Sequence, residues 1–123
     1  MNRSKHQLLV DVFMLRAGQE VPTEPTVPDL DVRKLRAKLI MEEALETCAA
    51  MGIEVAYKSD IYNLDIDEIS FSDSTQAPNL VEVCDGCADI AVVTTGTLSA
   101  FGIDAAPIQK IVDESNLAKF APG

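Results

Sequence analysis

Acidic side chains gather in two short stretches of this sequence, and each has the spacing of one helix face. The first is Glu42-Glu43-Ala44-Leu45-Glu46, and the second places Glu82, Asp85 and Asp89 at positions i, i+3 and i+7. Carboxylate oxygens are the ligands that magnesium prefers, and bound magnesium also contacts substrate phosphates. Two helices with inward carboxylates therefore indicate a site for metal-assisted hydrolysis of a phosphate compound.

The helical wheel favours a buried position for the first stretch. At about 100° per residue, one stripe contains Leu35, Leu39, Glu42, Glu46 and Ala49. Its leucines predict that the stripe faces the core, so its two glutamates would place charge there, with Glu43 beside them. Clustered buried carboxylates need compensating cations. The alternative is a solvated acidic face with ion pairs to Lys38 or Arg36.

Asp89 is the strongest candidate ligand in the second stretch. It interrupts the apolar run Cys87-Ala-Asp-Ile-Ala-Val-Val93, where an aspartate is a poor helix former and a poor core residue. The other two acids have structural alternatives. Glu82 is placed to close a capping box with Asn79, and Asp85 is placed to lie on an exposed turn.

The composition favours one helical domain and disfavours nucleic-acid binding. The 123 residues include 47% apolar residues, only 5% aromatics and no Trp, which suits helices packed through aliphatic side chains. Twenty acidic and ten basic residues give a formal charge of −10, which repels nucleic-acid backbones. The same charge would repel a free nucleotide, so a phosphate substrate would need metal ions to screen it.

The cysteines indicate a reduced, cytoplasmic setting. They are odd in number, and they follow an N-terminal segment that is too polar for a signal or membrane segment. No membrane association is expected. Cys84 and Cys87 form a C-x-x-C pair, but a zinc site needs about four ligands, and only Cys48 and His6 remain. Core packing is therefore the better interpretation of this pair.

Four helices are predicted to position the acids. Three are expected at about 4–17, 29–51 and 79–102, and the fourth begins at Asp104 and ends near the segment 115–119. The expected caps and stops are Asp29 or Asp31, Asn79, Asp104, Gly18 and Gly52. Three prolines make 20–28 an extended connector. Two alternating runs, 54–58 and 68–72, predict a small irregular or hairpin insertion at about 53–78. The expected fold is an all-α four-helix bundle that spans 1–123 as one domain.

Both motifs resemble one enzyme family. The run Arg36-Ala-Lys-Leu-Ile-Met-Glu-Glu-Ala-Leu-Glu46, followed by Glu82-Val-Cys-Asp-Gly-Cys-Ala-Asp-Ile90, is similar to the MazG-like all-α nucleoside triphosphate pyrophosphohydrolases. The tail segments 96–104 and 115–119 also look like members of this superfamily. The resemblance implies metal-dependent cleavage of an NTP or dNTP to the nucleoside monophosphate and pyrophosphate. It also implies a MazG-like bundle that forms a homodimer or homotetramer.

The resemblance assigns roles to both acidic stretches. Mg²⁺ would be the cofactor, with Mn²⁺ able to substitute, and Glu42 would orient or deprotonate the attacking water. The implied ligands are Glu43, Glu46, Asp85 and Asp89, with Glu82 as a secondary candidate. The family's second motif is E-x-x-D, which Glu82 and Asp85 match literally. A register built on Asp89 would instead require Glu at position 86, where the sequence has Gly86.

Four further residues are candidate substrate contacts. The resemblance implies that Asn116 and Lys119, just past the last helix, contact phosphate or sugar. Their alternative is an ordinary polar helix end, where a lysine suits the helix dipole. Lys34 and Arg36 would either neutralise phosphates or pair with nearby acids.

Two other functions are compatible with the sequence. The chain would be a non-catalytic helical module that binds a nucleotide or a partner through its acidic groove if Gly86 marks a degenerate metal site. It would be a phosphoribosyl-ATP pyrophosphohydrolase if it uses the substrate of that architecturally related enzyme, although the insertion weighs against this alternative.

Overall fold

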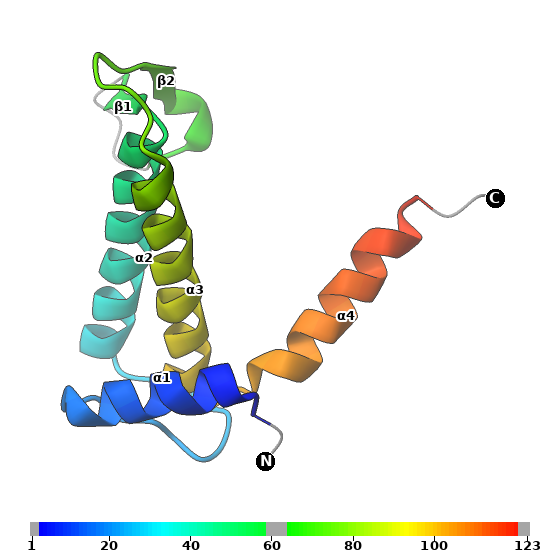
Figure 1. The fold of residues 1–123 in the computed structure, drawn as a ribbon. Helices are drawn as coiled ribbons and strands as arrows, with labels where there is room; N and C mark the ends of the chain where they lie inside the picture. Colours follow the sequence, from blue (N-terminus) through cyan, green and yellow to red (C-terminus); the bar gives the residue numbers. More distant parts are fainter. Residues whose placement is uncertain (1–2, 59–63, 121–123) are drawn as a thin grey trace. The chain divides into compact units, whose positions relative to one another are not determined.

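A computed structural model describes residues 3–58 and 64–120, which form four α-helices and one small antiparallel hairpin (Figure 1). The helices are α1 (Lys5–Arg16), α2 (Leu30–Ala50), α3 (Leu80–Ala100) and α4 (Ala105–Ala118). The hairpin consists of β1 (Ile53–Tyr57) and β2 (Ile69–Asp73), and it lies between α2 and α3 in the chain. The mostly helical fold with an inserted hairpin confirms the predicted fold class.

Short polar residues begin the first two helices, and glycines with positive φ end them. The Ser4 side chain accepts a hydrogen bond from the Gln7 amide at 3.1 Å, and Asp29 Oδ1 accepts one from the Val32 amide at 3.0 Å. Asp29, rather than Asp31, therefore caps α2. Gly18 and Gly52 follow the two helices with φ of 81° and 75°.

The predicted cap of the last helix is partly wrong. Asp104 occupies the N-cap position of α4, but its side chain makes no capping hydrogen bond. It accepts instead from Arg3 Nε at 2.8 Å. Gln7 Oε1 accepts from the first helical amide, that of Ala105, at 2.8 Å. Gln7, which is distant in the sequence, therefore makes the capping contact that was predicted for Asp104.

The hairpin fixes the path of the chain from α2 to α3. Ile53 pairs with Asp73, and Tyr57 pairs with Ile69, in an antiparallel register. The Ser74 amide donates to the Gly52 carbonyl at 2.8 Å, which extends the pairing beyond the strands. Residues 59–63 of the expected polar region lie outside the described residues.

The chain divides into two compact units, and the division falls inside α2 and α3. One unit contains residues up to 36 together with those from 94 onward, and the other contains 37–93.

No single helix in the described part of the chain is long and apolar enough to cross a membrane. Among the described helices, only α3 and α4 taken together, as a bent pair, reach the length and apolar composition of a span.

A buried polar network holds the unit that contains α1 and α4. Arg3, whose side chain is 2% exposed, donates to Asp11 at 2.7 Å and to Asp104 at 2.8 Å. Ser99 is fully buried, donates to Asp11 at 2.5 Å and accepts from Gln7 Nε2 at 3.0 Å. These bonds join α1 to the end of α3 and to the start of α4.

Candidate functional site

The inner face of α2 within the 37–93 unit differs from the predicted stripe. Thr47 and Ala50 are buried and Glu43 is half-buried, whereas Glu42 and Glu46 are exposed. The three inner residues follow the spacing i, i+4, i+7 of one helix face. The prediction that Glu42 and Glu46 continue a core stripe is therefore wrong, and Glu43 is the inward carboxylate of the motif.

The contact between Thr47 and Gly86 explains the shift of this face. A Cβ atom on Gly86 would overlap the Oγ1 atom of Thr47. The same Oγ1 atom donates to the Glu43 carbonyl at 2.7 Å, which fixes the threonine side chain. Small side chains thus mark the face where the helices meet. A glutamate at position 86 would not fit, so Gly86 has a packing explanation that does not require a degenerate motif.

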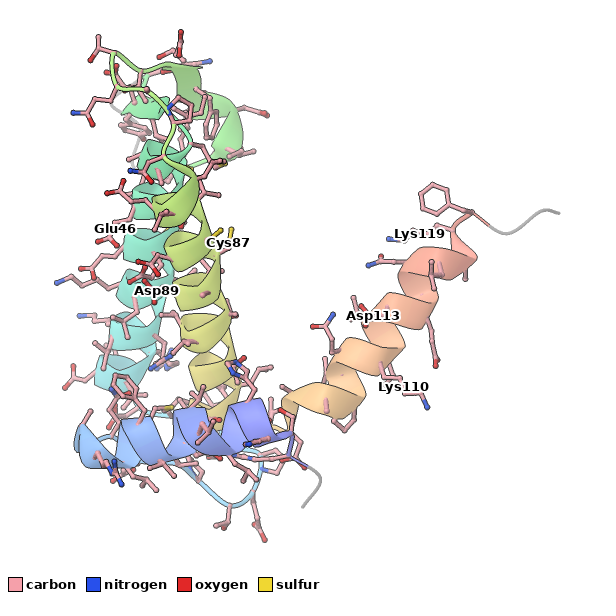
Figure 2. The ribbon with its side chains drawn as sticks, viewed as in Figure 1. Glu46, Cys87, Asp89, Lys110, Asp113 and Lys119 are labelled. Atoms are coloured by element: carbon pink, nitrogen blue, oxygen red, sulfur yellow. The ribbon has the colours of Figure 1, made fainter. Side chains whose placement is uncertain are left out.

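A cavity of about 370 Å³ lies beside this contact. It is lined by Glu46, Ala49 and Ala50 of α2, by Gln76 of the preceding loop, and by Glu82, Asp85, Gly86 and Asp89 of α3. The three acids of α3 share one face, as their spacing predicts, so both registers of the second motif lead to the same cavity. Figure 2 shows Asp89 on the side of α3 that faces α2, whereas Cys87 projects from the other side.

The capping box predicted at the start of α3 is only half formed. The Glu82 amide donates to Asn79 Oδ1 at 3.1 Å, as a capping asparagine requires. The Asn79 amide, however, donates to the Ala50 carbonyl at 2.9 Å. The Glu82 side chain lines the cavity, where it is available to a ligand.

Glu43 is the electrostatically unusual member of the site. Its Oε2 atom is the one buried side-chain polar atom in the described residues that lacks a hydrogen-bond partner. Burial raises the pKa of the Glu43 carboxyl, and the negative charges of Glu46, Asp89 and Glu42 raise this pKa further. A cation would relieve both the missing contact and the repulsion between these carboxylates.

The donor set fits the magnesium ion that the resemblance implies. Within residues 3–58 and 64–120, no three His, Cys, Asp or Glu side chains converge as they stand on a point that would hold a metal. The acids are nevertheless all oxygen donors, they come from two helices, and one of them has an unpartnered buried oxygen. By donor type, the residues that could hold the ion are Glu43, Glu46, Asp85, Asp89 and Glu82.

Glu42 occupies a different position from the rest of the motif. Its side chain is 49% exposed and lies 3.8 Å from Lys38 Nζ, one helical turn away. This is the ion pair expected for a solvated acidic face. Glu42 is also absent from the cavity lining, so its catalytic role stays a prediction.

The four predicted substrate contacts belong to the unit of residues up to 36 and from 94 onward. Lys34 is exposed, whereas Arg36 is 4% exposed and donates to Thr97 at 3.2 Å and to Gln19 at 3.1 Å. Burial lowers the pKa of the Arg36 guanidinium. Arg36 therefore has a packing role within its own unit.

The positions of Asn116 and Lys119 correct a predicted boundary. Asn116 lies inside α4, and Lys119 is the C-cap residue, so Asn116 does not follow the helix as expected. Lys119 Nζ donates to Asn116 Oδ1 at 3.0 Å, which brings the two predicted contacts together. Both are exposed, as groups that meet a substrate must be.

Sequence reasoning missed Gln76, which lines the cavity between the acids of α2 and α3. No motif marks this residue. Its position depends on the loop after β2, where the Gln76 amide donates to Ser74 Oγ at 3.1 Å. The only signal in the sequence is its place just before Pro78 and Asn79, at the entry to α3.

One family profile matches this chain. The profile describes the phosphoribosyl-ATP pyrophosphohydrolase family, and it matches residues 10–116, which include both acidic motifs. A search of curated proteins found no match. The matched family is part of the MazG-like all-α superfamily, which confirms the resemblance at the level of the superfamily. The chain therefore belongs to the phosphoribosyl-ATP pyrophosphohydrolase family and is a pyrophosphohydrolase that acts on phosphoric anhydride bonds.

Proposed function

We propose that this protein is a magnesium-dependent pyrophosphohydrolase that cleaves an NTP or dNTP between the α and β phosphates. The products are the nucleoside monophosphate and pyrophosphate. The single observation that carries the proposal is that Glu46, Glu82, Asp85 and Asp89 line one cavity, while Oε2 of the neighbouring Glu43 is buried without a hydrogen-bond partner. A family profile for pyrophosphohydrolases supports the same class of reaction.

The acids have separate roles in this proposal. When bound, magnesium (or Mn²⁺ in its place) would neutralise phosphate charge and promote attack by water. Glu46, Asp85 and Asp89 would hold the cation, Glu43 would complete the set through its buried Oε2 atom, and Glu82 would be a secondary ligand. Glu42 accepts the proton of the attacking water, which its exposed position allows. Thr47 and Gly86 set the separation of the two helices that carry these groups.

A second candidate substrate is phosphoribosyl-ATP, and the family profile is the observation that favours it. Its triphosphate has the same α–β anhydride, so the roles of the acidic residues do not change. The two candidates differ only in what the protein must accommodate beyond the triphosphate.

The remaining contacts come from charged and apolar surfaces outside the cavity. We propose that Asn116, Lys119 and Lys34 contact phosphate or sugar, whereas the predicted contact of Arg36 is set aside because that side chain is buried. We also propose a homodimer or homotetramer, because α4 exposes Ile108, Ile111 and Val112 on adjacent turns of one face.

The three cysteines are free, which suits a reducing cytoplasmic setting.

A substrate panel tests the proposal directly. The purified protein is incubated with Mg²⁺ and each NTP, each dNTP and phosphoribosyl-ATP, and pyrophosphate release is measured. Release from an NTP or dNTP is the expected result, whereas release from phosphoribosyl-ATP alone would select the second candidate. Tight nucleotide binding without any release would identify a non-catalytic module instead.

A further inference from the structure

A second cavity adjoins the acidic one within the 37–93 unit. Its volume is about 420 Å³, within the range of ligand pockets. It is lined by Leu45 and Ala49 of α2, by β1, and by the loop of residues 74–76. Ala49 and Gln76 line both cavities, so the two are neighbours that share part of their walls.

The two cavities offer different chemistry to one ligand. The first contains the carboxylates that would hold a cation and its phosphates. The second has an aliphatic side formed by Leu45, which is 48% exposed, and by Ile53 and Val55, which share one face of β1. The rest of its lining is polar and includes Glu54, Ser74 and Thr75. Exposed aliphatic surface next to a charged site suits a flat, uncharged ring.

Gln76 stands at the junction of the two cavities, and its loop is tightly anchored. Gly52 adopts a φ of +75°, and a Cβ atom there would lie 3.1 Å from Pro78 and 3.2 Å from the Gln76 carbonyl. The Ser74 amide donates to the Gly52 carbonyl, and the Asn79 amide donates to the Ala50 carbonyl. The loop is thus fixed at both ends to the end of α2. A primary amide at a fixed position offers both a donor and an acceptor to a ligand.

We propose that the second cavity is the nucleobase subsite. The base lies against Leu45, Ile53 and Val55, the Gln76 amide bonds to its polar edge, and the phosphates extend into the acidic cavity. This inference rests on the proposed function, because it requires a nucleotide substrate. It also assigns a role to the inserted hairpin, which carries β1 between α2 and α3 (Figure 1).

Binding without hydrolysis gives the first test. Isotope-labelled protein is titrated with adenosine, guanosine, cytidine and uridine, and then with ribose, while NMR follows methyl groups and side-chain amides. At least one nucleoside should shift the methyl signals of Leu45, Ile53 and Val55 and the amide signal of Gln76, and ribose should shift none. Shifts confined to α4 methyls, or no shifts, would overturn the subsite. This readout does not depend on catalysis, so it decides the matter even if no nucleotide is hydrolysed.

Substitution of the junction residue gives the second test. Gln76→Ala should lower kcat/KM for the preferred nucleotide about tenfold, mostly through KM, because one hydrogen bond to the base is lost. It should lower the kcat/KM of the base-free substrate ribose 5-triphosphate by clearly less than tenfold. Gln109→Ala is the matched control, since Gln109 is an exposed glutamine on α4 whose amide bonds to Asp113. Equal losses with both substrates would show a general structural effect and would contradict the proposal.

Discussion

Gly86 of α3 packs so closely on Thr47 of α2 that a Cβ atom at position 86 would overlap the threonine hydroxyl. Asp85 directly precedes this contact, and Asp89 follows it by about one turn. Glu43 lies one turn before Thr47 on α2, and its carbonyl accepts a hydrogen bond from the Thr47 hydroxyl. The close approach of two small residues therefore sets the spacing between the carboxylates of the two helices.

Gly86→Ala should lower the free energy of unfolding by about 1–3 kcal/mol, because the added methyl group overpacks the contact. The gain in helix propensity, about 1 kcal/mol, offsets only part of this loss. Adding Thr47→Ala should recover much of the stability. Urea denaturation of the single and double variants measures the coupling. The exposed residue Cys84 provides a control, since Cys84→Ala should change stability by less than about 0.5 kcal/mol. A fully stable Gly86→Ala protein would contradict the packing argument.

Arg3→Met should destabilise the protein by about 3–5 kcal/mol, because it leaves the carboxylate of Asp11 in a nearly buried position without its cation. The variant also removes the bond from Arg3 to Asp104 at the start of α4. Arg3→Lys should cost less, since it keeps the charge but loses the two-sided geometry of the guanidinium. Thermal unfolding followed by circular dichroism ranks the three proteins. Equal stability of the Met and Lys variants would show that the charge is unimportant.

Helices, caps and hairpin follow local rules, and most could be predicted from the sequence. Glycines 18 and 52 end helices by adopting positive φ, and Asp29 and Asn79 cap them through short side chains. Asp104 is the exception. Its side chain is drawn to Arg3, about a hundred residues earlier in the chain, and no local pattern reports such a contact.

The candidate site was only partly predictable for the same reason. Spacing alone placed Glu82, Asp85 and Asp89 on one face, and all three line the cavity. The wheel failed on α2 because it assumed that leucines mark the contact with α3, whereas Thr47 and Gly86 mark it. The orientation of the glutamates then changed, and Glu43 became the inward one. Gln76 depends on how a loop folds back, which spacing does not encode.

Glu43→Gln should stabilise the metal-free protein at neutral and alkaline pH. The pKa of Glu43 is raised above its ordinary value of 4.5, so the folded state favours the protonated form. The stability that this protonation gives is fully present below the unfolded pKa and is lost as pH rises through the folded pKa. The wild type should therefore lose stability relative to the variant as the pH rises from the unfolded pKa of Glu43 through its higher folded pKa. Tm of both proteins, measured in EDTA from pH 4 to pH 8, tests the sign of this difference in stability.

Magnesium should reverse that order, because a cation bound beside Glu43 stabilises the native state by mass action. Wild-type Tm should rise with Mg²⁺ concentration, whereas the Glu43→Gln protein should gain less. Glu114→Gln, at an exposed position on α4, is the control and should respond to Mg²⁺ as the wild type does. Equal Mg²⁺ responses of the wild type and Glu43→Gln would argue against a cation at this carboxylate.

Ile111→Glu should weaken self-association, because it places a charge in the exposed apolar face of α4, where Ile111 is 63% exposed. The variant should sediment with a lower mass than the wild type at the same concentration. Gln109→Glu adds the same charge at a polar position of the helix and should leave the mass unchanged. A wild-type protein that sediments as a monomer would remove the proposal of a homodimer or homotetramer.

Glu46→Gln and Glu42→Gln should separate the metal-holding role from the proton-accepting role. Glu46 lines the acidic cavity, so its variant should lose both pyrophosphate release and the Mg²⁺-dependent gain in Tm. Glu42 lies outside that lining and next to Lys38, so its variant should keep the gain in Tm while kcat falls by about 10²–10⁴. Lys38→Ala is the control for the exposed ion pair, whose loss costs only about 0–1 kcal/mol. If Glu42→Gln is as active as Lys38→Ala, then Glu42 is a surface acid and another group must accept the proton.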